Sequence, residues 1–216
     1  MTLEVDLYWS FRSPYCYLAG DRLAALEREH DLRLSVRPVL PIAVRIPGFF
    51  KTVNPLRVPY NRMDAERVAA SLQVPFHWPR PDPIVMDVAT GEVPADQPYI
   101  HRLTRLGALA AEQGRGLPFV RAVAALLFGA GIDGWDRGAH LARAVAGAGL
   151  DLAEMEAAVA DDAGRLDAAI AANEAAQTAA GHWGVPLMVF RGEPFFGQDR
   201  IDLLLWRLRQ AGLRAR

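Results

Sequence analysis

The sequence predicts an α/β fold in which an N-terminal strand–helix–strand unit and a C-terminal strand–strand–helix unit are separated by a large inserted all-helical subdomain. Three observations carry this prediction. Apolar and polar residues alternate twice near the start of the chain, on either side of a segment with helical spacing. The middle is rich in Ala and Leu at helical spacing, and two short apolar runs precede an amphipathic segment at the end.

The first elements are predicted to be a strand, a helix and a second strand. Residues 3–8 alternate with period two, as expected of a strand with one buried face. Ser13 and Pro14 predict a helix start, because Ser caps free N–H groups and Pro at the first helical position loses no needed donor. The helix should continue to about Glu29. Residues 32–39 then predict a strand parallel to the first, since a helix connects the two.

The middle of the chain is predicted to be helical, with two irregular stretches before it. Prolines make residues 41–59 irregular and residues 74–98 mostly loop, while Asn61–Leu72 between them has helical spacing. The helical spacing returns at Tyr99 and lasts to about Ala180, where glycines divide the sequence into several helices.

The end of the chain predicts a β-hairpin and a last helix. Residues 186–190 form a short apolar strand, Gly192 and Glu193 form a turn, and residues 194–196 form the return strand. Residues 201–208 predict an amphipathic helix. With the helical block removed, this is the order of a thioredoxin-like fold, βαβ…ββα.

The helical block is too long to be a connection, so two parts are predicted. Residues 1–60 and 181–216 form a thioredoxin-like domain, and residues 61–180 form the inserted helical subdomain. A chain of 216 residues is long enough for one domain with such an insertion.

Composition excludes several classes of partner. With 24 basic and 25 acidic residues the net charge is −1, so no nucleic-acid partner is expected. The best apolar run, residues 122–132, is about half of the ~20 residues that a membrane span needs, so no membrane association is expected. The N-terminus lacks a secretory signal and one cysteine excludes an internal disulfide, so the expected location is cytoplasmic. The five histidines show no metal-ligand spacing, and no metal is expected.

The first candidate site is Ser13-Pro14-Tyr15-Cys16, where the first predicted strand meets the first helix. Thioredoxin-like proteins place their reactive group here, because free N–H groups and the helix dipole stabilise an anion. Redox members carry Cys-x-x-Cys, whereas Ser13 occupies the first position here, so a dithiol cycle is not expected. The site instead suits a thiolate brought in by a ligand. The structural alternative is that Ser13 and Pro14 only cap the helix.

Two further candidate sites lie near the end of the chain. Val185 and Pro186 open the third strand, where thioredoxin folds carry a cis-Pro and where the preceding residue offers its backbone to a peptide-like ligand. Gln198 and Asp199 precede the last helix and suit the ammonium and carboxylate of a free amino-acid end, such as the γ-glutamyl group of glutathione. The structural alternatives are a proline at a strand start and an ordinary helix cap.

Several short motifs occur in order over nearly the whole chain. They are Ser13-Pro14-Tyr15-Cys16-Tyr17-Leu18, Val74-Pro75-Phe76, Phe128-Gly129 with Ile132-Asp133, Gly184-Val185-Pro186, and Phe196-Gly197-Gln198-Asp199-Arg200-Ile201. In these motifs the chain resembles 2-hydroxychromene-2-carboxylate isomerases and the related kappa-class glutathione transferases, in the DsbA-like branch of the thioredoxin fold. Cys16 stands where that family more often has Ser, and the loop from Lys51 to Pro59 aligns only loosely.

The resemblance implies glutathione as a bound cofactor, with Ser13 as the catalytic residue that hydrogen-bonds its sulfur. The cofactor-binding set is Ser13, Tyr15, Asn54, Val185, Pro186, Gln198 and Asp199. The implied substrate is a small aromatic carboxylate: 2-hydroxychromene-2-carboxylate is interconverted with trans-o-hydroxybenzylidenepyruvate by reversible addition of the thiolate. A homodimer is also implied. A kappa-class-like glutathione transferase and a non-catalytic glutathione- or peptide-binding protein share the same motifs and remain alternatives.

Some residues have two interpretations. Cys16 is either a tuned thiol or a buried small apolar residue, and the second interpretation is favoured. Arg12 or Arg62 either contacts a substrate carboxylate or is solvated surface. Four aromatic residues either line a substrate pocket or belong to the core: Phe11, Tyr15, Trp78 and Trp183.

Overall fold

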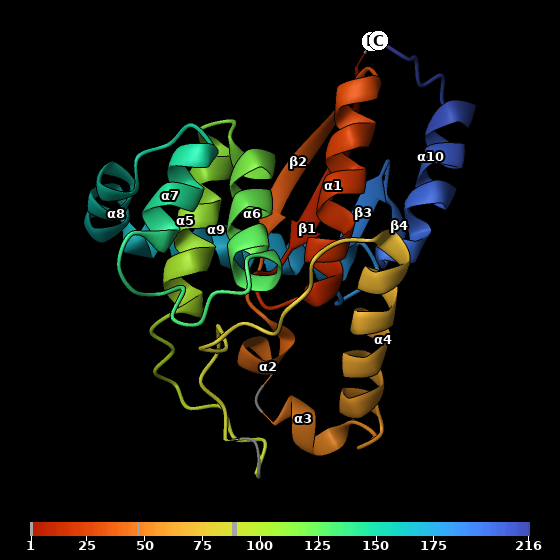
Figure 1. The fold of residues 1–216 in the computed structure, drawn as a ribbon. Helices are drawn as coiled ribbons and strands as arrows, with labels where there is room; N and C mark the ends of the chain where they lie inside the picture. The colour runs from red at the N-terminus through yellow and green to blue at the C-terminus, as the bar shows by residue number, and fades with distance from the viewer. Residues whose placement is uncertain (1, 47, 88–89) are drawn as a thin grey trace.

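The computed structural model describes residues 2–46, 48–87 and 90–216, and it confirms the predicted α/β class. Among these residues, four strands form one sheet in the order β2-β1-β3-β4 (Figure 1). The strands are β1 (Leu3–Trp9), β2 (Leu32–Pro38), β3 (Leu187–Phe190) and β4 (Glu193–Phe196). β1 and β2 are parallel, whereas β3 is antiparallel to both β1 and β4. The predicted thioredoxin-like arrangement is therefore confirmed.

Helix α1 (Pro14–Glu29) begins and ends where the sequence predicts. Ser13 has an extended backbone and caps the helix, and Pro14 takes the first helical position. The face that includes Cys16, Leu23 and Leu26 is buried in the apolar core of the molecule. Because α1 follows β1 through a short turn, its N-terminus lies at the carboxyl edge of the two parallel strands.

The segment predicted to be irregular contains two short helices, α2 (Ile42–Arg45) and α3 (Phe49–Thr52). Helix α4 (Arg57–Leu72) starts earlier than the expected Asn61. The sequence predicts irregular chain up to Pro59, but this proline lies in the first turn of α4, where a missing N–H costs no helical hydrogen bond. The early start matters, because it places Arg57 on a helix beside α1.

The Ala- and Leu-rich middle of the chain forms several helices, as predicted, and is called the helical part below. Its helices are α5 (Ile100–Glu112), α6 (Gly116–Ala124), α7 (His140–Gly147), α8 (Leu152–Asp161) and α9 (Ala163–Ala179), with a π-helical turn at Ala125–Gly129. Helices α5, α6 and α9 contact β2, so the helical part covers the sheet on the side of that strand (Figure 1). One apolar core runs from the sheet into these helices; Phe11 and Phe119 meet in it edge to face, 6.0 Å between ring centroids.

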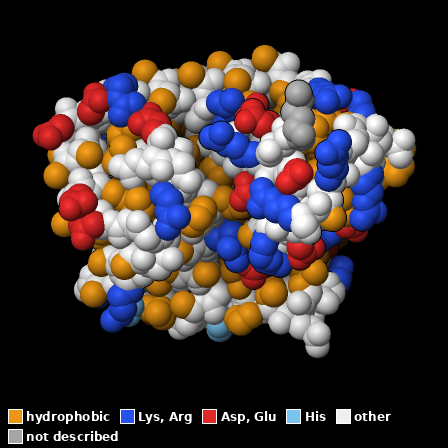
Figure 2. All heavy atoms as spheres, turned by 90° about the horizontal axis from the view of Figure 1, so that it is seen from above, with side chains coloured by type: hydrophobic (Ala, Val, Ile, Leu, Met, Phe, Trp, Pro, Cys, Tyr) orange, Lys and Arg blue, Asp and Glu red, His pale blue; other side chains and the backbone are white. Residues whose placement is uncertain are grey.

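The C-terminal elements follow the predicted order, with α10 (Ile201–Gln210) after β4 and a short 3₁₀ turn at Gln198–Arg200 between them. In the described part of the chain, no helix has the length and apolarity needed to cross a bilayer. On the face drawn in Figure 2, basic and acidic side chains are interspersed, and hydrophobic side chains reach the surface between them.

Candidate active site

A cleft of about 1200 Å³ opens at the carboxyl edge of β1 and β2, beside the N-terminus of α1. It is lined from sequence-distant elements: Ser13 and Tyr15 of the α1 start, Arg57 and Arg62 of α4, and Val185 before β3. Among the described residues that line the cleft, five are arginines and two are aspartates, so its wall is on balance basic. The fold therefore brings two of the three predicted site segments into one cleft.

Ser13 is the half-buried N-cap of α1, and its side-chain oxygen accepts a hydrogen bond from the Cys16 N–H at 3.3 Å. The same hydroxyl donates to the Val185 carbonyl oxygen at 3.4 Å. This long bond joins two segments that are 172 residues apart. A hydroxyl in this position can exchange its bond to the carbonyl for a bond to an anion at the helix terminus.

Val185 contacts Ser13 in the cleft, and the peptide bond that joins Val185 to Pro186 is cis. The Pro186 carbonyl accepts from the Gly197 N–H at 2.9 Å, which ties this segment to the start of α10. Among the described residues, none accepts a backbone hydrogen bond from the Val185 N–H. A peptide-like ligand could accept a hydrogen bond from that N–H, as one β-strand does from the backbone of the next.

Gln198 and Asp199 do not line this cleft, although they directly follow Gly197, which is hydrogen-bonded to Pro186. Both the backbone and the side-chain carbonyl of Gln198 accept from Arg22, at 2.9 and 3.2 Å. Asp199 is exposed and pairs with Arg200 at 2.8 Å. Their polar groups already have protein partners, which a charged ligand end would have to displace.

Asn54 and Tyr15 are each bound within the protein. Asn54 is exposed, does not line the cleft, and accepts the Leu56 N–H at 2.9 Å in a turn before α4. Tyr15 lines the cleft, but its hydroxyl donates to Asp64 of α4 at 2.7 Å. Burial and this hydrogen bond raise the pKa of Tyr15 well above 10, so the phenol stays protonated and ties α4 to α1.

Cys16 is fully buried beneath Ser13, and burial raises the pKa of its thiol to about 12. The interpretation of Cys16 as a buried small residue is confirmed. Because the thiolate is the reactive form, we expect iodoacetamide at neutral pH to modify the native protein more than ~10²-fold more slowly than the unfolded protein. Mass spectrometry of time points with and without urea measures both rates; equal rates would show that Cys16 is accessible.

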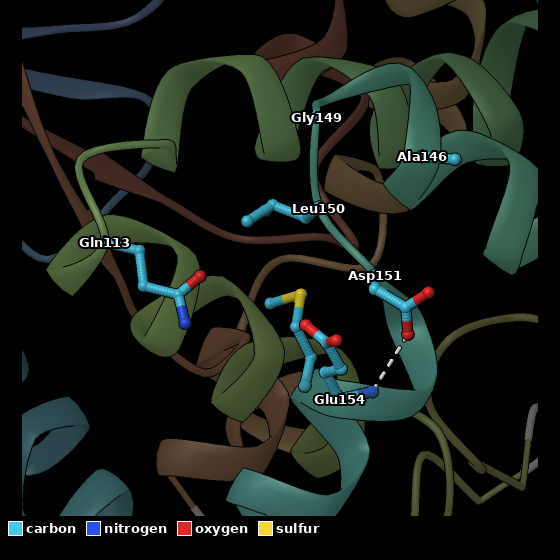
Figure 3. A pocket seen from close by; sticks show the side chains of 7 residues that line it. Gln113, Ala146, Gly149, Leu150, Asp151 and Glu154 are labelled. Atoms are coloured by element: carbon cyan, nitrogen blue, oxygen red, sulfur yellow. Dashed lines mark hydrogen bonds between the residues drawn. The ribbon is translucent and has the colours of Figure 1, made fainter.

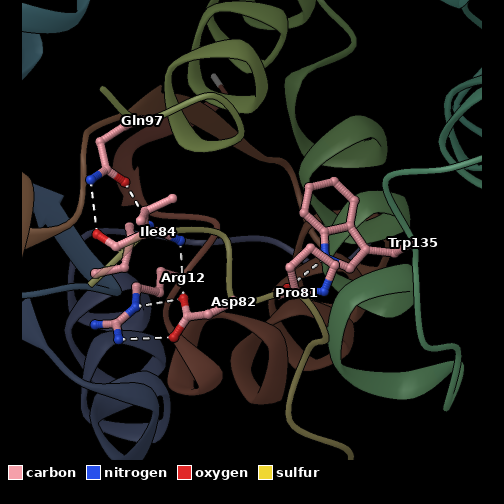
Figure 4. Close-up of polar contacts among 7 residues, drawn as sticks. Arg12, Pro81, Asp82, Ile84, Gln97 and Trp135 are labelled. Carbon is pink, nitrogen blue, oxygen red and sulfur yellow. Dashed lines mark hydrogen bonds and ion pairs between the residues drawn. The ribbon is translucent and has the colours of Figure 1, made fainter. Parts of the chain in front are cut away.

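The arginines of the cleft differ in what they already bind. Arg12 forms two hydrogen bonds to Asp82, at 2.9 and 3.0 Å, and so is not free for a carboxylate (Figure 4). Arg57 stacks on both Phe49 and Trp183, 5.2 Å from each ring centroid, and no carboxylate of the described residues pairs with it. Arg57 carries no signal in the sequence, because it lies in the proline-rich stretch that is predicted to be irregular.

Arg62 stacks on Trp78 at 5.1 Å, and it also lacks a carboxylate partner among the described residues. Trp78 itself donates to Glu66 at 2.8 Å, which fixes its ring against Phe76. The aromatic residues proposed from the sequence are therefore divided: Trp78, Trp183 and Tyr15 line the cleft, whereas Phe11 is core.

The loop after α4 closes one side of the cleft, and polar contacts fix its path (Figure 4). Asp82 accepts from the Ile84 N–H at 3.0 Å in addition to Arg12, and Trp135 donates to the Pro81 carbonyl at 2.8 Å. Gln97, which is buried, donates to and accepts from the Val85 backbone at 2.9 and 2.8 Å. The loop is thus an ordered wall of the cleft at these contacts.

A second, smaller cavity of about 440 Å³ lies among α5, α7 and α8, where Leu150 and Glu154 face Gln113 (Figure 3). Its Asp151 accepts the Glu154 N–H at 3.0 Å and so caps α8. None of the predicted site residues lines it. Among the described residues, no group of three or more His, Cys, Asp or Glu side chains is placed to hold a metal ion.

The fold and the site at a helix N-terminus agree with a comparison of the sequence with known families. Residues 4–209 match the family model of the DsbA-like thioredoxin domain, and the chain belongs to that family. It is 29% identical over 208 residues to a 2-hydroxychromene-2-carboxylate isomerase of Sphingobium xenophagum, covering 94% of this chain and 97% of the relative. The resemblance inferred from the motifs is thereby confirmed.

Solved structures share the fold. A 2-hydroxychromene-2-carboxylate isomerase superimposes with a TM-score of 0.70 at 22% identity, covering 97% of this chain and 96% of the other. A probable DsbA oxidoreductase of Streptomyces coelicolor gives 0.66 at 20% identity, covering 97% and 89%. The cytosolic disulfide reductase DsbM of Pseudomonas aeruginosa, solved with GSH, gives 0.58 at 19% identity, covering 96% and 100%.

Proposed function

We propose that the protein is a glutathione-dependent isomerase that acts on 2-hydroxychromene-2-carboxylate or a similar unsaturated aromatic keto acid. The observation that carries the proposal is the Ser13 hydroxyl at the N-terminus of the 16-residue α1, 3.4 Å from the Val185 carbonyl. This arrangement offers a hydroxyl donor and helix N–H groups to an anion, beside the Val185 backbone, which can pair with a peptide. The sequence similarity to an isomerase supports the choice of reaction.

The residues of the cleft fit the tripeptide. The cleft of about 1200 Å³ exceeds a typical ligand pocket and has room for a tripeptide and a substrate together. In the proposal, the free Val185 N–H and its carbonyl bind the cysteinyl backbone, and the γ-glutamyl end lies toward Gln198 and Asp199. The opposite end of an extended tripeptide then points toward Trp183, where the Arg57 guanidinium can bind the second carboxylate.

When bound, glutathione supplies a thiolate that adds reversibly to the unsaturated carbon, so that rotation about the resulting single bond precedes loss of the thiol. Ser13 and the N-terminus of α1 stabilise the negative charge on sulfur, which keeps the nucleophile ionised near neutral pH. The chain cannot form an internal disulfide in place of this chemistry, because Cys16 is its single cysteine and is buried. A homodimer and a cytoplasmic location complete the proposal and rest on the family resemblance and the cysteine content.

The decisive experiment is an assay in which the concentration of glutathione is far below the concentration of the keto-acid substrate. We expect many turnovers of trans-o-hydroxybenzylidenepyruvate per glutathione, because the thiol is released unchanged, and free thiol measured after the reaction should equal the amount added. Stoichiometric loss of thiol with a conjugate detected by mass spectrometry would instead identify a transferase. Binding of glutathione without turnover of any unsaturated keto acid would identify a binding protein.

Substrate selection is expected to depend on Arg62. A charge-assisted hydrogen bond contributes roughly 1.5–3 kcal/mol, and exposure of Arg62 places its effect near the lower end, so Arg62→Gln should lower kcat/KM for the keto acid by about tenfold. The matched methyl ketone, which lacks the carboxylate, should react equally well with both proteins. An equal loss on both substrates would show that Arg62 supports the cleft rather than binds the carboxylate.

A further inference from the structure

Three successive carbonyl groups before the cis bond, those of residues 183–185, each accept a hydrogen bond from a different part of the fold. Arg45 of α2 donates to the first at 2.8 Å, Gln177 of α9 donates to the second at 2.7 Å, and Ser13 donates to the third at 3.4 Å. The segment that faces the helix terminus is therefore fixed by side chains from three elements: the start of α1, α2 and α9.

Arg45 and Gln177 act as one unit. The Gln177 side-chain oxygen accepts from Arg45 Nη1 at 2.9 Å, while its Nε2 binds the carbonyl of Gly184. Gln177 is fully buried, although most neighbouring positions of α9 are exposed. A buried amide is costly unless both of its ends are bonded, as they are here. Arg45 is itself half-buried, and burial lowers its pKa while nearby Glu174 opposes this effect.

We infer that Arg45 and Gln177 are positioning residues that hold the backbone of residues 183–185 at the distance from Ser13 that a thiol-bearing peptide requires. Neither residue needs to touch the thiol. Their effect passes through the Val185 backbone, whose N–H and C=O must lie in register with the cysteinyl group while the Ser13 hydroxyl meets the sulfur. This inference rests on the proposed function, since it assumes a thiol tripeptide in the cleft.

The inference predicts that loss of these hydrogen bonds weakens glutathione binding even in protein that remains folded. Gln177→Leu removes the donor to Gly184 and the acceptor for Arg45 together while keeping a side chain of similar volume. Misplacement of a binding group by about 1 Å costs up to ~10²-fold, so glutathione affinity should fall by roughly tenfold or more. The pKa of the bound thiol should move back toward the value of free glutathione, because Ser13 no longer meets the sulfur.

The experiment measures glutathione affinity by calorimetry and the pKa of the bound thiol by ultraviolet absorbance, in the full chain. Thr178→Ala is the matched control: this exposed neighbour on α9 donates only to the Glu174 carbonyl of its own helix, and its affinity should match the wild type. Arg45→Lys keeps the positive charge but has one nitrogen in place of the two that make these bonds, and it should show the same loss in smaller degree. If Gln177→Leu does not fold, Arg45→Lys decides alone.

The outcomes separate the two proposals. If the wild-type protein does not bind glutathione, the proposed function fails. If the wild type binds and lowers the pKa of the bound thiol, but folded Gln177→Leu or Arg45→Lys does both equally well, only the positioning role is overturned. A fall in melting temperature with unchanged affinity and thiol pKa in the folded fraction would likewise overturn it, because it would assign these bonds to stability alone.

Discussion

Replacing Ser13 with alanine is expected to lower the isomerisation rate by about 10²-fold or more, as the loss of other oxyanion donors does. The substitution removes the side-chain hydroxyl that caps α1 and donates to the Val185 carbonyl. The helix N–H groups and the Val185 backbone remain, so glutathione should still bind. We therefore expect kcat to fall far more than glutathione affinity, in a steady-state assay at saturating glutathione.

The control for this variant is Ser71→Ala. Ser71 is an exposed serine that donates only to the Val68 carbonyl of its own helix, α4, and its loss should leave the rate unchanged. Restoration of the Ser13→Ala rate at raised pH would support a role in thiol ionisation, because the unaided thiol ionises near pH ~8.5. A Ser13→Ala variant with an unchanged rate would remove Ser13 from the mechanism.

Replacing Phe119 with alanine is expected to destabilise the fold by about 3–5 kcal/mol. Phe119 of α6 is fully buried and meets Phe11, which lies two residues before Ser13, edge to face. The ring thus links the helical part to the turn that carries the site. Since whole domains are stable by only about 5–15 kcal/mol, this single cavity should remove a large share of the free energy of unfolding.

Urea unfolding followed by circular dichroism measures this change, and Leu203→Ala provides the control. Leu203 is a large apolar residue of α10 that is half exposed, so its truncation should alter the free energy of unfolding by less than about 0.5–1 kcal/mol. If Phe119→Ala cost no more than Leu203→Ala, the two parts of the chain would not depend on this shared core.

The sequence was sufficient for elements whose local signals agree. Helix α1 was predicted from end to end, because Ser13 and Pro14 mark its start and apolar spacing marks its buried face. The strands were predicted to within one residue at most ends, since β1 and β2 alternate and the hairpin has a clear turn. The start of α4 could not be predicted, because a proline is equally compatible with the first turn of a helix and with a loop.

The candidate site was harder to predict, since it depends on side-chain contacts across the fold. Ser13 and Val185 were placed in one cleft as expected, because their positions follow from the fold. Arg12 pairs with Asp82, whereas Arg57 stacks on Phe49 and has no carboxylate partner in the described part of the chain. Both outcomes depend on the paths of two proline-rich loops. No periodicity encodes those paths, so sequence alone could not rank these arginines.

The measurement that tests the account most directly is the pKa of the glutathione thiol in the complex, followed by the ultraviolet absorbance of the thiolate during a pH titration. If the N-terminus of α1 and the Ser13 hydroxyl stabilise the anion, the pKa in the complex will lie below the ~8.5 of a free thiol. Affinity will then rise with pH between the lowered pKa and the free one, and level off above it. A bound thiol that titrates as it does in free solution, or a tripeptide that does not bind, would contradict the assignment.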